Sequence, residues 1–76
     1  MTPPEIYDLR GLNCPLPVLK ARKRLAGMTV GEQLWLETTD PLAVIDIPAF
    51  CNESGHRLVS TEPMSEGHRF LVERGA

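Results

Sequence analysis

Short runs in which apolar and polar residues alternate predict four β-strands, at residues 5–9, 32–39, 57–62 and 68–73. In the first run Tyr7 and Leu9 fall on one side of the strand, and in the second Leu34 and Leu36 share a face. Trp35 lies between those two leucines and should point to the opposite face of the sheet. The strands therefore present one apolar face on which a core can form.

In two longer segments apolar residues recur at spacings of three and four, which predicts a helix in each. The apolar stripe of the first helix, residues 15–26, consists of Val18, Ala21 and Leu25 and continues to Met28. The apolar stripe of the second, within residues 42–54, consists of Val44, Ile47 and Cys51. Both helices should pack through these stripes against the sheet.

Five further residues predict where the second helix begins, bends and ends. Asp40 followed by Pro41 is typical of an N-cap and the first helical position. Pro48 lies inside the segment, where proline usually kinks or breaks a helix. We therefore expect a first turn, a kink at which Asp46 caps a restart, and then the main helix, which Gly55 ends.

The element order βαβαββ predicts an α/β (α+β) two-layer sandwich with both helices on one face of the sheet, because β-α-β crossovers are right-handed. Seventy-six residues form a single domain, 1–76. No stretch is long enough to span a membrane, and the N-terminus lacks the apolar run of a signal peptide. We therefore expect a soluble cytoplasmic protein, and its net charge of -2 argues against a dedicated nucleic-acid binder.

Cys14 lies between the first strand and the first helix and is the leading candidate for a nucleophile. Pro15 and Pro17 fit the helix positions N1 and N3, which would make Cys14 the N-cap. A thiol there would meet the helix dipole and the free N–H groups of the first turn, and both lower a thiol pKa. Gly11 supplies the backbone freedom for a tight turn before it. The alternative is that Cys14 caps the helix and is inert.

The other reactive side chains have simpler interpretations. Cys51 lies on the apolar stripe of the second helix, so it should be a core thiol, and no Cys-x-x-Cys pair is present for two-thiol redox exchange. His56 and His68 show no metal-ligand spacing, so no metal site is predicted. Asp40 and Asp46 resemble acid–base residues, but helix capping explains each.

Half of the basic residues lie in the first helix, at Lys20, Arg22, Lys23 and Arg24. Cations near the C-terminus of a helix interact favourably with its dipole, which is one explanation. The other explanation is that Lys20, Lys23 and Arg24 form a docking patch for an acidic partner, on the helix that presents the candidate nucleophile. The two explanations are compatible.

The segment Cys14-Pro15-Leu16-Pro17 resembles the Cys-Pro-x-Pro signature of the TusA/SirA-like sulfur-carrier family. Other segments that resemble this family are Asp8 to Pro15, Thr39 to Pro41, Asp46 to Cys51 and Gly55 to Leu58. The resemblance covers about residue 5 to residue 74. It implies a mixed sheet with the strand order 1-2-4-3.

The resemblance also implies a sulfurtransferase that acts as a stoichiometric relay, without a cofactor. Cys14 would accept sulfane sulfur as a persulfide from a cysteine desulfurase or another persulfide donor. It would pass the sulfur to an acceptor protein in tRNA 2-thiouridine synthesis, sulfur oxidation or cofactor assembly, with no direct nucleic-acid or membrane partner. One alternative is a regulatory protein-interaction module in which Cys14 is structural. An RNA-binding module is a second alternative, suggested by fold analogy alone, and the acidic balance argues against it.

Overall fold

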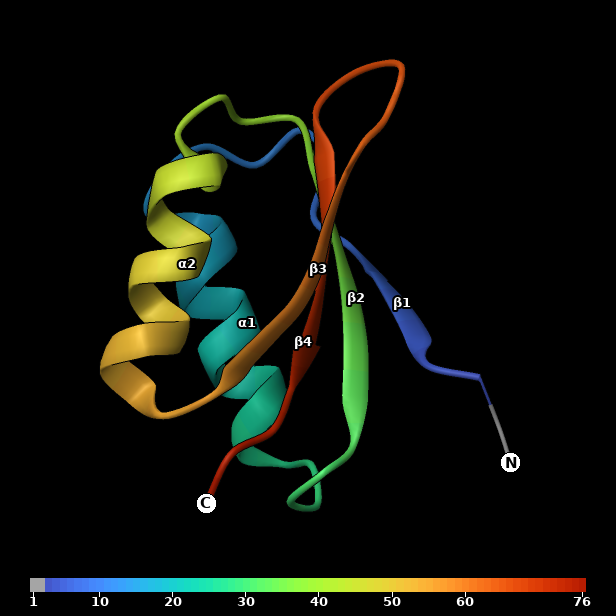
Figure 1. Ribbon diagram of the computed structural model, residues 1–76. Helices are drawn as coiled ribbons and strands as arrows, with labels where there is room; N and C mark the ends of the chain where they lie inside the picture. Colours follow the sequence, from blue (N-terminus) through green and yellow to red (C-terminus); the bar gives the residue numbers. More distant parts are fainter. Residues whose placement is uncertain (1–2) are drawn as a thin grey trace.

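The computed structural model describes residues 3–76. Its elements in chain order are β1 (Glu5–Asp8), α1 (Leu16–Ala26), β2 (Gln33–Thr38), α2 (Ala43–Ser54), β3 (Arg57–Pro63) and β4 (His68–Glu73). The strand order is β1-β2-β4-β3, with β1 parallel to β2 and β4 antiparallel to both of its neighbours. Both helices cover the same face of the sheet (Figure 1), which confirms the predicted two-layer sandwich and mixed sheet.

The core lies between the helices and the sheet. Its buried apolar residues are Leu9, Ala21, Leu25, Leu34, Leu36, Ala43, Ile47, Phe50, Cys51, Phe70 and Val72. The predicted inward faces of β2 and the core position of Cys51 are confirmed. Trp35 lies on the opposite face, as predicted, with the guanidinium of Arg69 4.1 Å from its ring centroid. Each fully buried large apolar side chain contributes about 1.5–3 kcal/mol, which is substantial for a chain of this size.

Helix α2 differs from the prediction at its start and at its proline. It begins at Ala43, with Leu42 as its N-cap residue, and it continues to Ser54 with Pro48 inside it. The predicted restart of the helix at Asp46 was therefore wrong. Proline removes one backbone donor, so only the bond to the Val44 carbonyl is lost, and Val44 lies where solvent reaches it, at 40% exposure. The predicted stripe was wrong at that residue too, since Ala43 is buried in its place.

Two contacts near the C-terminus join distant parts of the chain. Nη1 of Arg74 lies 2.9, 3.0 and 2.6 Å from the carbonyl oxygens of Leu25, Ala26 and Met28, so it donates to the open C-terminal end of α1. Gly67, in the β3–β4 turn, has a φ of 87°. A Cβ at Gly67 would lie 2.7 Å from the Cα of Thr39 and would collide with the carbonyl oxygen of Thr38. That turn therefore packs tightly against the end of β2.

Candidate functional site

Cys14 lies outside the first helix, in the loop that joins β1 to α1. Helix α1 begins at Leu16, and Pro15 occupies its N-cap position. The carbonyl of Pro15 accepts the N–H of Leu19 at 3.1 Å, which is the bond that opens the helix. The predictions that Cys14 is the N-cap, and that Pro15 and Pro17 occupy N1 and N3, were wrong by one position each. The peptide bond between Cys14 and Pro15 is cis.

The loop that follows β2 holds the Cys14 loop in place. The N–H of Gly11 donates to Oγ1 of Thr39 at 2.9 Å, and the N–H of Cys14 donates to Oδ2 of Asp40 at 2.7 Å. Oδ1 of Asp40 accepts the N–H of Leu42 at 3.2 Å, before the first turn of α2. Asp40 is only 8% exposed, so the two hydrogen bonds that its carboxylate accepts are largely shielded from water. Gly11 has a φ of 84°, a conformation that favours glycine.

The thiol of Cys14 is exposed and lies beside carboxylates. A hydrogen bond to the Asp46 carboxylate is the largest cause of a raised pKa at Cys14. Partial desolvation and the negative charges of Asp46 and Asp40 raise this pKa further. The sequence-based expectation of a lowered pKa was therefore wrong. Its physical error lay in counting only the helix that follows the thiol and not the acidic start of the helix beside it.

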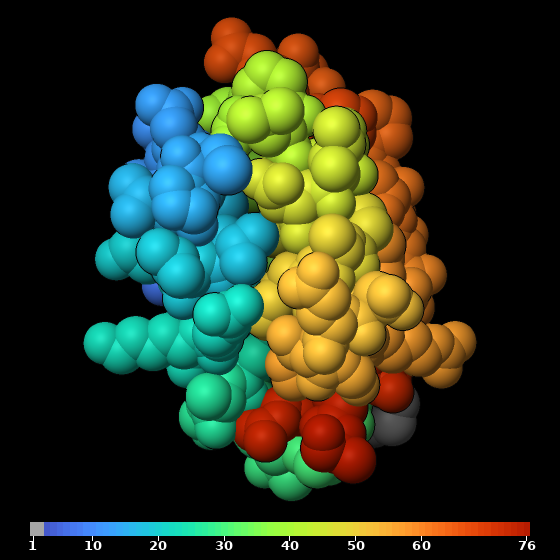
Figure 2. Space-filling view, turned by 90° about the vertical axis from the view of Figure 1, so that its left-hand side faces the viewer, coloured from blue at the N-terminus to red at the C-terminus, as the bar shows by residue number. Residues whose placement is uncertain are grey.

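Exposed apolar side chains come from the same two helix starts. Leu16 and Leu19 on α1 are 44% and 48% exposed, and Leu42 and Ile45 at the start of α2 are 50% and 65% exposed. Figure 2 shows that the segments around residues 10–20 and 40–46 lie against each other on one face of the molecule. We call these four side chains the apolar rim. A group of exposed apolar side chains on one face is typical of a protein–protein contact.

Three of the predicted basic residues, Lys20, Lys23 and Arg24, lie on the side of α1 next to the edge strand β1, whereas Arg22 lies over the Phe50 ring of α2, 5.6 Å from its centroid. Lys20 and Lys23 are exposed, whereas Arg24 forms an ion pair with Glu5 and stacks over Tyr7, 5.0 Å from the ring centroid. A pocket of about 380 Å³ is lined by Tyr7, Lys20, Lys23, Arg24, Gly27 and Met28. The structure therefore brings the three predicted docking residues together, but away from the N-terminal end of α1 that adjoins Cys14.

The remaining titratable candidates are structural. Burial raises the pKa of Cys51 to about 11. Burial and the nearby charge of Arg74 lower the pKa of His56, whose Nδ1 accepts the N–H of Gly75 at 3.0 Å. Within residues 3–76, no group of three His, Cys, Asp or Glu side chains is placed to hold a metal ion. In the same part of the chain, neither helix has the length and hydropathy needed to cross a membrane.

Sequence reasoning assigned Asp40 and Asp46 to helix capping alone and gave no role to the apolar rim. The signal for the rim is present in the sequence, since Leu42 and Ile45 fall outside the buried positions of an amphipathic helix. The effect of the Asp46 carboxylate on the pKa of the thiol has no such signal. It depends on how the Cys14 loop meets the first turn of α2, which is far from it in the sequence.

The arrangement provides one exposed thiol on a fixed loop, carboxylates beside it, and exposed apolar side chains on the two helices that begin next to this loop. Such a site can exchange a sulfur atom with another protein. A family model described as sulfurtransferase TusA matches residues 5–74, which include Cys14 and all six elements of the fold. This match covers nearly the whole chain and shows its family and its general activity. The chain belongs to the TusA family of sulfurtransferases.

Proposed function

We propose that the protein is a sulfur carrier that holds sulfane sulfur as a persulfide on Cys14 and relays it between proteins. The observation that carries this proposal is the exposed Cys14 thiol, on a loop fixed by Asp40, in a chain whose other thiol is buried. Cys51 is 2% exposed, so it is not available to resolve a persulfide on Cys14 as an internal disulfide. A single accessible thiol suits a carrier better than a dithiol oxidoreductase.

In the loading step, the Cys14 sulfur attacks the outer sulfur of a persulfide on the donor, such as a cysteine desulfurase. A new S–S bond forms on Cys14, and the S–S bond of the donor breaks, which releases the donor's thiolate. The thiol proton of Cys14 goes to that thiolate, so Cys14–SH and donor–S–SH become Cys14–S–SH and donor–SH. No external oxidant or reductant is needed. Delivery repeats this exchange with a thiol of the acceptor protein.

The carboxylate of Asp46 favours the protonated thiol in the empty carrier. An empty carrier is therefore a weak nucleophile toward other electrophiles near neutral pH, because the thiolate is the reactive form. A donor that contacts the apolar rim would place its persulfide against Cys14. Because desolvation also favours the protonated thiol, the Cys14 proton would leave only as its sulfur attacks the donor persulfide.

The partners in this proposal are a persulfide donor and a downstream acceptor protein, and the cytoplasm is the compartment in which both thiols stay reduced. The apolar rim would dock the partner near the thiol, and Lys20, Lys23 and Arg24 would steer acidic partners toward α1. The pathways that fit this role are tRNA 2-thiouridine synthesis, sulfur oxidation and cofactor assembly. The family match supports sulfur transfer in general, and the exposed thiol supports the relay.

The test is intact-mass measurement after incubation with a cysteine desulfurase and cysteine. The expected result is the addition of one sulfur, about 32 Da, which reductant removes and which Cys14→Ser never acquires. The carrier loaded with this sulfur should then pass it to an acceptor thiol. The Cys51→Ala variant is the matched control and should load normally. If no tested desulfurase or persulfide donor gives a Cys14-dependent adduct, the carrier proposal fails and a protein-interaction module with a structural Cys14 becomes the better explanation.

A further inference from the structure

Strand β1 forms one edge of the sheet, and its outer side is open. The order β1-β2-β4-β3 leaves β1 with a single partner, and within residues 3–76 no strand pairs with its other side. The N–H of Leu9, just after the strand, donates to the carbonyl of Glu37 on β2 at 2.9 Å. Because backbone groups alternate along a strand, Tyr7 also faces β2, whereas Ile6 and Asp8 direct their N–H and C=O groups outward. An edge of this kind can pair with another strand.

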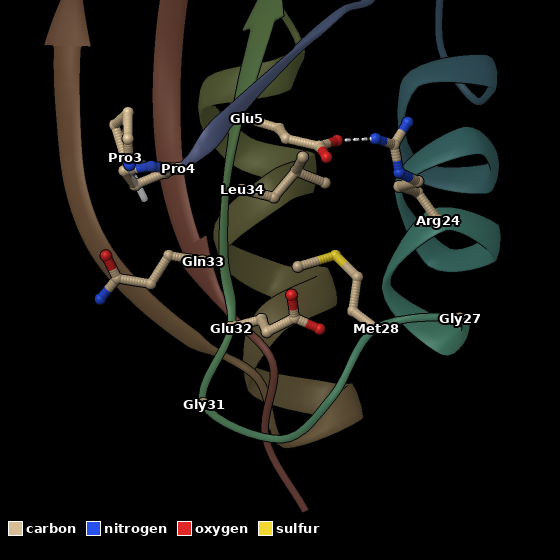
Figure 3. Close-up of a pocket in the computed structure, with 10 residues that line it drawn as sticks. All are labelled: Pro3, Pro4, Glu5, Arg24, Gly27, Met28, Gly31, Glu32, Gln33 and Leu34. Carbon is tan, nitrogen blue, oxygen red and sulfur yellow. Dashed lines mark hydrogen bonds and ion pairs between the residues drawn. The ribbon is translucent and has the colours of Figure 1, made fainter. Parts of the chain in front are cut away.

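Two pockets between β1 and α1 adjoin each other through Arg24, Gly27 and Met28, and we call them together the groove. The upper part is the 380 Å³ pocket next to Tyr7, and the lower part, at the starts of β1 and β2, is an open pocket of about 1170 Å³. The residues that line the lower part are drawn in Figure 3 and include Glu5, Met28 and Leu34. The Glu5–Arg24 ion pair bridges β1 and α1 across the groove, as Figure 3 shows. The groove therefore has an edge strand on one side and a helix on the other. Extended peptides add to a sheet in this arrangement.

The charge on the helical side of the groove is positive. Lys20 and Lys23 are exposed at its upper part and form no ion pair within residues 3–76. Arg24 adds a third cation. Its present partner Glu5 has a side chain that is 71% exposed, so Arg24 can exchange Glu5 for a carboxylate of a bound chain at little cost in free energy. Tyr7 provides an aromatic floor between these cations. Glu5 and Glu32 line the lower part of the groove, so the upper part is the one whose charge fits an extended acidic chain.

We propose that this groove binds an extended acidic segment of a partner protein, which adds to the outer edge of β1 as a fifth strand and places its carboxylates against Lys20 and Lys23. The inference deepens the proposed docking role of α1 and rests on it, but it does not depend on the chemistry of Cys14. Lys23 lies seven residues beyond Leu16, about 10 Å along the helix axis from its first residue. A segment bound there anchors the partner and leaves the thiol uncovered, so the two contacts together raise the effective concentration of the partner at Cys14.

The test uses the Cys14→Ser protein, so that failure of sulfur loading cannot affect the result. The probe is a blocked hexapeptide that alternates Val and Glu, and the control peptide carries Lys in place of Glu. Hydrogen exchange measured by NMR should slow about tenfold at the Ile6 and Asp8 amides when the acidic peptide is bound, because they acquire carbonyl partners. The Tyr7 amide, already paired with β2, should change little. The Lys peptide should not bind.

Charge reversal tests the attraction of the acidic peptide to the lysines, and blocking of the β1 edge tests strand addition. The double variant Lys20→Glu, Lys23→Glu should weaken peptide binding about tenfold, while Arg57→Glu, the same change at an exposed residue on the opposite edge of the sheet, should not. Ile6→Pro removes an outward donor that the sheet does not use and should also weaken binding. A peptide N-methylated on the side that faces β1 makes the same test without altering the protein.

Three results would overturn the proposal. Binding that depends on the lysines but leaves the Ile6 and Asp8 amides unprotected would show charge attraction without strand addition. A dimer that Ile6→Pro abolishes would show that a second copy of the chain uses this edge. A single-stranded oligonucleotide that displaces the peptide and ignores Ile6→Pro would show that the cations serve a nucleic acid.

Discussion

The carboxylate of Asp40 joins Cys14 to the start of α2. Oδ2 lies 2.7 Å from the backbone nitrogen of Cys14, and Oδ1 lies 3.2 Å from that of Leu42. One largely buried side chain therefore fixes the loop that carries the thiol relative to the helix that carries Asp46. Asp40 thus holds the backbone of Cys14, and its negative charge also raises the pKa of the Cys14 thiol.

Asp40→Asn should loosen this link. The amide keeps one acceptor oxygen but turns an NH2 group toward one of the two backbone N–H donors. We expect a loss of about 1–3 kcal/mol in the free energy of unfolding, because a partly buried donor loses a charged acceptor. Urea denaturation measures this loss, and Glu66→Gln at an exposed turn position is the control. An unchanged midpoint would mean that Asp40 does not fix the loop.

Asp46→Asn should make Cys14 more acidic. The Asp46 carboxylate raises the pKa of Cys14 through a hydrogen bond and its charge, so its removal lowers that pKa. The thiolate fraction then rises at any pH below the wild-type pKa, and the pH profile of iodoacetamide alkylation moves to lower pH. Glu53→Gln, which removes an exposed charge at the far end of α2, should leave the profile in place. A shift to higher pH in the Asp46 variant would contradict the assignment.

Cys51 should be unreactive in the native protein. Burial raises its pKa to about 11, so at neutral pH both its charge state and its 2% exposure disfavour attack. Mass spectrometry should find one alkylated cysteine under native conditions and two in urea. Cys51→Ala should cost about 1 kcal/mol of stability, since the volume lost is small, and should leave sulfur loading intact. Native labelling of both cysteines at similar rates would show that Cys51 is accessible.

Ile45→Glu should slow sulfur transfer without unfolding the protein. Ile45 is 65% exposed on the apolar rim, so its replacement has little effect on the core, within about 0.5 kcal/mol. A carboxylate there would be desolvated when a partner docks, and we expect transfer to slow about tenfold. Val30→Glu, in a loop away from the rim and 61% exposed, is the matched control. Equal transfer rates for the two variants would show that the apolar rim is not part of the docking surface.

Arg74→Ala should destabilise the fold, because Nη1 of Arg74 donates to three carbonyls at the end of α1. The expected loss is about 2 kcal/mol in the free energy of unfolding, with partial rescue by Arg74→Lys. Chemical denaturation measures the loss, and Arg57→Ala at an exposed position should have almost no effect. A loss no larger than that of the control would show that water replaces the guanidinium.

The strand positions, the inward faces of β2 and the two-layer architecture could be predicted because they depend on local periodicity. Alternation places Leu34 and Leu36 in the core whatever lies elsewhere in the chain. The strand order came from family resemblance, since periodicity does not encode which strands become neighbours. The break at Pro48 was predicted from a local cost that the surrounding helix overrides.

The thiol environment could not be predicted, because it is made by contacts between residues distant in sequence. Cys14 could be identified as the candidate nucleophile from its motif, but its neighbour Asp46 lies on another helix. From sequence, an acidic residue in the first turn of a helix has a sufficient local explanation in the helix dipole. Only the position of the Cys14 loop beside the first turn of α2 shows that the same carboxylate also acts on the thiol.

The close packing of Gly67 against the end of β2 has a consequence during synthesis of the chain. Cys14 leaves the ribosome early, but Asp40 follows Thr39, the residue on which the β3–β4 turn packs, and β4 must insert between β2 and β3. Asp40, which holds the backbone of Cys14, therefore reaches its final position only when the last strand is in place. A loop near the start of the chain thus depends on the end of the chain for its arrangement.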